Sequence, residues 1–286
     1  MQMHEKSQII NLQTVKEIKQ SAKEYQQSVI SLEQLQKHDS LVALYIYAQN
    51  HLSVLMEIFA EMPVLKNLIR RIMLAQDKYM PSYPPMSPVT ESHFFCWSAF
   101  DLMVGGVKKE SFCTIICDYC NSTNFDAMLI EIFENFQQSY CGIYIHEGIH
   151  DDCVILRELI TNKRFTVKVA SGYAGKTGEL WYARVLPPLF GLNNYSVIFG
   201  TPYIISEVVG RNIQAEWLDY FERQLSISQN INKEKSYQDF MKFGINKDFW
   251  MEYITLAYLG FSSESIDVDG IPDIAESLPL GHLADW

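Results

Sequence analysis

Apolar residues recur at helical spacing through the first 80 residues of the chain. In residues 10–29 they lie three to five positions apart between Lys and Gln residues, and "SLVALYIYAQNHLSVLMEIFAEM" is a more apolar run with Ser40 as a candidate N-cap. Such spacing gathers the apolar side chains on one face of a helix. Pro63 opens the next run, where proline suits a first helical turn. We therefore predict an N-terminal helical region at residues 1–80.

The period of the apolar pattern changes at residues 141–205. "GIYIHE" and "CVILREL" are rich in β-branched residues, and "KRFTVKVAS" alternates apolar with polar positions. "ELWYARVL" and "YSVIFGTPYII" follow, and Gly, Asn and Asp mark turns between these segments. The pattern predicts an α+β fold that is mostly helical, with a small antiparallel β-sheet or partial barrel at about 141–205. A sheet of this size needs helices to pack against.

Proline and charge predict the remaining boundaries. Residues 81–90 are a Pro-rich linker, and residues 91–205 carry helices followed by the β-unit. The spacing in residues 206–260 predicts C-terminal helices, and the last two predicted helices end at glycines. The stretch 261–286 holds six acids without Lys or Arg and is expected to be a loosely docked acidic tail.

Charge and cysteine usage narrow the classes of protein. The net charge is −11, which argues against the basic footprint of a nucleic-acid-binding protein. The densest basic cluster is Lys66, Arg70 and Arg71, interpreted as a solvated helix face. The start, "MQMHEKSQIINLQ", lacks the apolar core of a secretory signal, and no run is long enough to span a bilayer. Six cysteines without a disulfide pattern favour a reducing cytoplasm.

The spelling His-Glu-x-x-His occurs at His146, Glu147 and His150. In zinc peptidases two histidines four residues apart on a helix share one Zn²⁺, and the glutamate activates the bound water. In a strand the same residues lie about 13 Å apart, too far to share a metal. Spacings of three and four favour a helix here, whereas Gly148 and the β-branched neighbours favour a strand and turn. We predict the strand, and keep a zinc-dependent hydrolase as the alternative.

Two further groups of side chains carry possible chemistry. Cys113, Cys117 and Cys120 would offer three thiolates on one helix face, although buried cysteine more often packs as a small apolar residue. In the β-unit Arg184 adjoins aromatic residues, and this part of the sequence has a local excess of positive charge although the net charge of the whole chain is negative. A binding surface there would stack a base or peptide on the following residues: Arg184, Trp181, Lys163 and Arg164.

Residues 93–208 resemble an uncharacterised bacterial segment found in some large proteins that carry a SEC-C zinc motif. The likeness is carried by "HFFCWSAFDL", "QSYCGIYIHEGIHDDCVILRELITNKRFTV", "GELWYARVLPP" and "YSVIFGTPYIIS". The resemblance implies a strand and turn at residues 143–150 and implies no activity. The chain departs from the SEC-C pattern, since it has no cysteine after Cys153.

These observations lead to one hypothesis and two alternatives. The hypothesis is a non-enzymatic cytoplasmic protein that binds another macromolecule, expected to be a protein, without a cofactor or a membrane partner. The first alternative is the zinc hydrolase with Glu147 as its catalytic base. The second is nucleic-acid binding by the β-unit. The sequence assigns neither a substrate nor a partner identity.

Overall fold

The computed structural model describes residues 29–80, 88–104, 109–123, 125–189, 191, 193–207, 209–227 and 232–272. The helix predicted in residues 10–29, residues 81–87 of the linker and residues 273–286 of the tail lie outside this part of the chain, apart from residue 29. The described helical elements are η1 (Leu32–Leu35), α2 (Ser40–Ala60), η2 (Pro63–Leu65), α3 (Lys66–Tyr79), α4 (Glu91–Cys96), the π-helical turn η3 (Trp97–Asp101), α5 (Phe112–Ser122), α6 (Ala127–Gln138), α7 (Ile213–Ile227), α8 (Lys233–Phe243) and α9 (Phe249–Ala257).

The strands form one mixed sheet with the order β1-β2-β3-β5-β4-β6-β8-β7. Their bounds are β1 (Cys141–His150), β2 (Cys153–Glu158), β3 (Arg164–Val169), β4 (Leu180–Leu186), β5 (Ser196–Ile198), β6 (Tyr203–Ile205), β7 (Tyr258–Phe261) and β8 (Ile266–Val268). Most neighbours are antiparallel, but the pairs β3–β5 and β6–β8 are parallel. The predicted α+β class is confirmed, whereas the sheet is larger than expected and is not purely antiparallel.

The first five strands close into a barrel, because β1 pairs with β4 as well as with β2. Residues 141–145 of β1 pair with β4 along one edge, and residues 144–150 pair with β2 along the other edge, with a bulge between His146 and Gly148 that bends the strand. Gly148 has a φ of 139°, which an L side chain rarely adopts, so glycine permits this bend. The ring order β1-β2-β3-β5-β4 is also that of the five-stranded barrel in OB folds.

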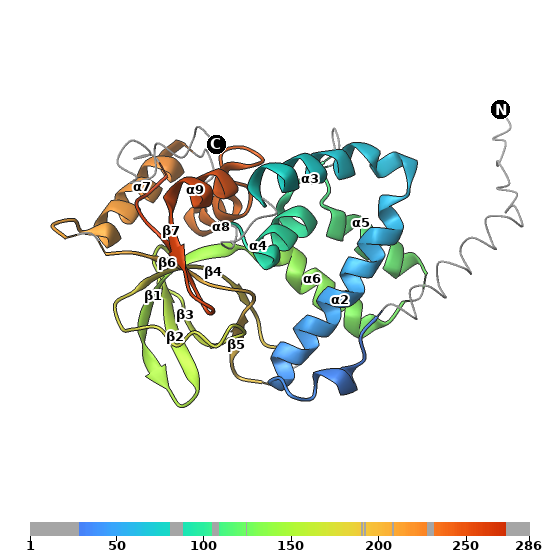
Figure 1. The fold of residues 1–286 in the computed structure, drawn as a ribbon, viewed down its shortest axis with the longest axis horizontal. Helices are drawn as coiled ribbons and strands as arrows, with labels where there is room; N and C mark the ends of the chain where they lie inside the picture. The colour runs from blue at the N-terminus through green and yellow to red at the C-terminus, as the bar shows by residue number, and fades with distance from the viewer. Residues whose placement is uncertain are drawn as a thin grey trace, which may run out of the picture.

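Alternation along the strands separates two apolar clusters. The smaller one fills the barrel and consists of Tyr144, Val154, Leu156, Val167, Trp181, Ala183, Ile198 and Ile204. The larger one lies between the barrel and the helices and runs from Leu41 to Ile271. Figure 1 shows the barrel with α2 to α6 on one side and α7 to α9 above it. The outer surface of β2 and β3 carries partly or fully exposed residues, so this face of the barrel is accessible.

Three predicted boundaries are wrong. The last helical run does not reach Gly260, because α9 ends at Ala257 and continues directly as β7. Residues 261–272 are not a loose tail, since β8 inserts between β6 and β7 and buries Ile266 and Val268. The N-cap of α2 is Asp39 rather than Ser40, because the Asp39 carboxylate accepts hydrogen bonds from the backbone of Leu41 and Val42.

None of the described helices combines the length and apolar character that crossing a bilayer requires.

Candidate functional site

The His-Glu-x-x-His segment lies on β1, in an extended strand rather than a helix. His146 points into the barrel, where it is 1% exposed and its ring centroid lies 5.4 Å from that of Trp181. The Gly148 N–H donates to His146 Nδ1 at 3.2 Å, so the proton is on Nε2, which lies 3.0 Å from the Ala174 carbonyl oxygen. Both ring nitrogens are therefore engaged in hydrogen bonds within the barrel.

The other two residues of the segment face different surroundings. Glu147 accepts hydrogen bonds from the Nε atoms of Arg164 and Arg157, each at 2.7 Å, and these bonds lower the pKa of its carboxyl. His150 is exposed and lies 3.2 Å from Asp151 at the end of the strand. The predicted strand and turn are confirmed. The zinc-hydrolase alternative at His146, Glu147 and His150 required a helix, and that premise is wrong.

The accessible face of β2 and β3 carries several basic residues, and in the structure their charges are compensated by nearby carboxylates. Arg157 and Arg164 share Glu147, and Lys163 pairs with Glu234 of α8. Lys168 lies 2.8 Å from Asp39 and 2.9 Å from Asp152. Each of these four cations thus has a carboxylate partner within the chain, which removes most of the positive potential that phosphate binding needs.

Arg184 and Trp181 do not contribute to that face. Trp181 is fully buried inside the barrel, where its indole N–H donates to Glu179 at 3.0 Å. Arg184 lies on the opposite side of β4, is 4% exposed, and points toward the helices. The expectation that the two form an accessible stacking surface with Lys163 and Arg164 is wrong, because β4 is paired along both edges and covered by helices.

Arg184 belongs instead to a buried charged cluster at the junction of barrel and helices. Its guanidinium pairs with Asp101 at the end of η3 and donates to the Ser139 carbonyl oxygen at 2.9 Å. Lys242 of α8 donates to the Gln137 carbonyl oxygen and to that of Ser139. Two cations therefore meet the C-terminal end of α6, where the helix dipole favours positive charge. We call Asp101, Arg184 and Lys242 the junction cluster.

Burial dominates the electrostatics of the junction cluster. It raises the pKa of the Asp101 carboxyl and lowers that of Lys242 to about 8. Nearby, burial lowers the pKa of His93 to about 3 and raises that of Cys96 to about 12. The adjoining cavity of about 10 Å³ has room for a single water at most. A neutral imidazole and a protonated thiol without space for a substrate fit a structural role, since reactive cysteines need a stabilised, accessible thiolate.

The thiols of α5 also lie in the core. Cys113 Sγ lies 4.0 Å from Cys117 Sγ and donates to the Phe133 carbonyl oxygen at 3.4 Å. Burial raises the pKa of Cys113, and also that of Cys120 to about 12. Across the residues that the structure describes, no three His, Cys, Asp or Glu side chains come together as a metal-holding group.

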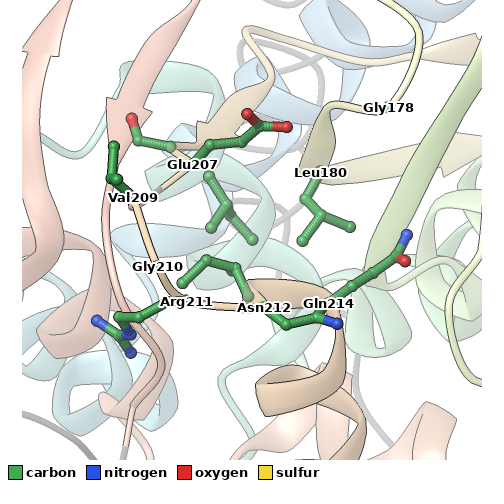
Figure 2. A pocket seen from close by; sticks show the side chains of 11 residues that line it. Gly178, Leu180, Glu207, Val209, Gly210, Arg211, Asn212 and Gln214 are labelled. Atoms are coloured by element: carbon green, nitrogen blue, oxygen red, sulfur yellow. The ribbon is translucent and has the colours of Figure 1, made fainter.

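Two open pockets border the barrel. The larger, about 640 Å³, is bounded by the start of β4, the end of β6 and the first turn of α7 (Figure 2). Its Arg211 already pairs with Glu216 of α7. The second, about 480 Å³, lies where residues 37–39 meet the β1–β2 hairpin and the end of β3. There Lys168 and Tyr195 both hydrogen-bond to Asp39, and together they fix the start of α2 to the barrel.

A different kind of surface lies on α3 and the turn before it. Val64 is 83% exposed, and Met73 and Leu74 are each 59% exposed. Lys66 and Arg70 precede Met73 at spacings that place all three along one helix face. Neither cation has an ion-pair partner among the described residues, in contrast to the cations of the barrel. We call these five residues the α3 surface.

Sequence reasoning found only part of these features. It noted Lys66 and Arg70 but interpreted them as an ordinary solvated helix face. The spacing of apolar residues does not tell which of them stay exposed after folding, so the exposed apolar neighbours of these cations could not be recognised. It missed Asp101 and Lys242 altogether. Asp101 had one signal, an acid directly after the aromatic run "FFCWSAF".

Comparison with protein-family models, with curated proteins and with solved structures gave no match to this chain.

Proposed function

We propose that this chain binds another protein, and that the α3 surface is the binding site. The observation that carries the proposal is the exposure of Val64, Met73 and Leu74 beside two cations without carboxylate partners. Large exposed apolar side chains favour burial against a partner, and each contributes on the order of 1–2 kcal/mol when it is covered. Hydrophobic contacts of this kind, ringed by charge, are typical of protein interfaces.

Charge indicates the chemistry of the partner. Helix α3 carries four cations and a single acid, Asp77, within a chain whose net charge is −11. A second copy of the chain would bring the same cations to the interface, so self-association through this surface is disfavoured. The partner we propose is a protein segment that presents apolar side chains next to carboxylates, since opposite charge steers association and fixes the register.

The test is a quantitative co-purification from native lysate with the full chain as bait. The variant is Met73→Glu/Leu74→Glu, and the matched control is Leu218→Glu, which places a glutamate on an exposed leucine of α7. Support requires a protein that wild type and control retain and the double variant loses, and whose complex re-forms from purified components. A protein retained equally by all three baits, or no reproducible protein, would contradict the proposal.

Nucleic-acid binding by the barrel is a second candidate, favoured by the strand order that the barrel shares with OB folds. In such barrels the face of β2 and β3 binds oligonucleotides. The compensated cations of this face weigh against it here. A single-stranded oligonucleotide whose affinity falls with salt and falls again in Arg164→Ala would favour this candidate over protein binding.

A further inference from the structure

Strand β7 forms one end of the sheet. It follows α9 without a connecting loop and pairs with β8 (Figure 1). Among the described residues no strand pairs with its outer edge. An edge strand presents a row of backbone donors and acceptors that can template pairing with another chain.

The direction of the backbone groups follows from the bonds that β8 makes on its other side. The Ile266 N–H donates to the Pro202 carbonyl oxygen at 3.1 Å, and the Val268 carbonyl oxygen accepts from the Ser206 N–H at 2.8 Å. The backbone N–H and carbonyl groups of Ile266 and Val268 therefore point toward β6. Those of Asp267, which lies between them, point toward Gly260 of β7.

The alternation then fixes the outer edge of β7. The Ser262 N–H donates to the Ser265 carbonyl oxygen at 2.9 Å, so Ser262 and Gly260 both direct their backbone groups toward β8. Phe261 consequently directs its N–H and its carbonyl oxygen away from the sheet. Leu259 lies in the bulge, where this alternation is interrupted.

The side chains of Leu259 and Phe261 are apolar and accessible. Leu259 is 43% exposed and Phe261 is 45% exposed. Proteins usually protect an edge with Lys, Pro or a bulge. β7 has a bulge between Tyr258 and Gly260 but neither of the protective residue types. Outward backbone groups and an accessible apolar side chain thus coincide at Phe261, the combination on which strand addition depends, and the accessible side chain of Leu259 lies nearby.

Two carboxylates lie near this edge. Glu264 lies in the β7–β8 turn, whose backbone accepts a hydrogen bond from Ser171, and Asp267 lies on β8 opposite Gly260 of β7. Asp267 lies close enough to Glu179 that the two carboxylates repel, and burial together with this repulsion raises the pKa of Asp267. Neither Glu264 nor Asp267 has an ion-pair partner among the described residues. A second copy of the chain would add its own carboxylates and a net charge of −11, which disfavours self-pairing.

We propose that the outer edge of β7 binds an extended segment of another protein, which alternates apolar side chains and carries Lys or Arg beside the β7–β8 turn. Main-chain hydrogen bonds to Phe261 hold the segment. Its apolar side chains cover those of Leu259 and Phe261, and its cations meet Glu264 and Asp267. This site is separate from the α3 surface and does not depend on it.

The probe is a short fluorescent peptide that alternates valine with threonine and ends in lysine residues, titrated against the full chain by anisotropy. Phe261→Pro removes the outward N–H while leaving the ladder to β8 intact, because proline is tolerated on an edge strand whose N–H faces solvent. We expect its affinity to fall about tenfold, the effect of losing a hydrogen bond and blocking the edge. Phe261→Thr keeps the donor and should weaken binding less.

Two controls do not depend on folding of the proline variant. A peptide whose alternate backbone amides are methylated should not bind the wild-type chain, and a peptide ending in glutamate should bind more weakly than the lysine peptide. Leu74→Glu, on the α3 surface, should leave peptide affinity unchanged, so the two proposals fail separately.

The proposal is overturned if the lysine peptide does not bind, or if methylation or Phe261→Pro leaves its affinity unchanged. Self-association of the chain that Phe261→Pro abolishes would also overturn it, since the occupant of the edge would then be a second copy.

Discussion

Replacing Arg184 with methionine tests the junction cluster. The guanidinium is 3% exposed, pairs with Asp101, and donates to the carbonyl and hydroxyl oxygens of Ser139 at 2.9 and 3.0 Å. Methionine fills a similar volume but leaves the Asp101 carboxylate buried without its partner. Lys242 lies 4.0 Å from the other Asp101 oxygen and compensates for part of this loss.

The expected loss in unfolding free energy is about 3–5 kcal/mol, the range for a buried ion pair that loses one partner, with Lys242 favouring the lower end. Since the unfolding free energy of natural proteins is about 5–15 kcal/mol, this loss is a large fraction of the total stability. Chemical denaturation at neutral pH under reducing conditions, followed by tryptophan fluorescence, measures it directly. The melting temperature should fall by about 10 °C.

Two variants make the result specific to burial. Arg164→Met breaks an accessible pair with Glu147 and should change stability little, because exposed ion pairs contribute little. Asp101→Leu/Arg184→Met removes both charges and should be less destabilised than Arg184→Met alone. A loss below about 1 kcal/mol for Arg184→Met, or equal losses for Arg184→Met and Arg164→Met, would refute the reasoning.

Three further outcomes are expected. Burial lowers the Lys242 pKa from 10.5 to about 8, so between these values the unfolded chain binds more protons. The unfolding free energy of wild type should therefore rise with pH relative to that of Lys242→Met, by up to about 3 kcal/mol by pH 10.5. Chemical denaturation at a series of pH values measures it, and a difference between the two proteins that does not change with pH would contradict this prediction. The purified chain should carry no stoichiometric zinc, because both ring nitrogens of His146 are hydrogen-bonded; elemental analysis that finds zinc lost in His146→Ala would contradict it. The buried thiols of Cys113 and Cys120 should react with a disulfide reagent only when the chain unfolds, and rapid labelling of the native chain would count against the structure.

The β-unit could be predicted from sequence because a strand that buries only one of its faces alternates apolar and polar residues. Val167 alternates with Thr166 and Lys168, and the β-branched run of β2 follows a turn at Asp151 and Asp152. The conformation of the His-Glu-x-x-His segment followed from the same local preferences. Closure of the barrel could not be predicted, since pairing of β1 with β4 joins segments about 40 residues apart and depends on register.

The last two strands were missed for a physical reason. The helical period of α9 runs into β7 without a turn residue, and tertiary pairing rather than local preference ends the helix at Ala257. In β8 only Ile266 and Val268 are buried, between acids that give the segment the composition of a solvated tail. Arg184 was misplaced similarly, because its partner Asp101 lies 83 residues away along the chain.

The most direct test of protein binding by the α3 surface is hydrogen–deuterium exchange of the full chain with and without its purified partner. We expect slower exchange in residues 62–79 on complex formation, with exchange in β2 and β3 unchanged. Protection confined to β2 and β3, with residues 62–79 unaffected, would contradict the assignment and move the binding site to the barrel.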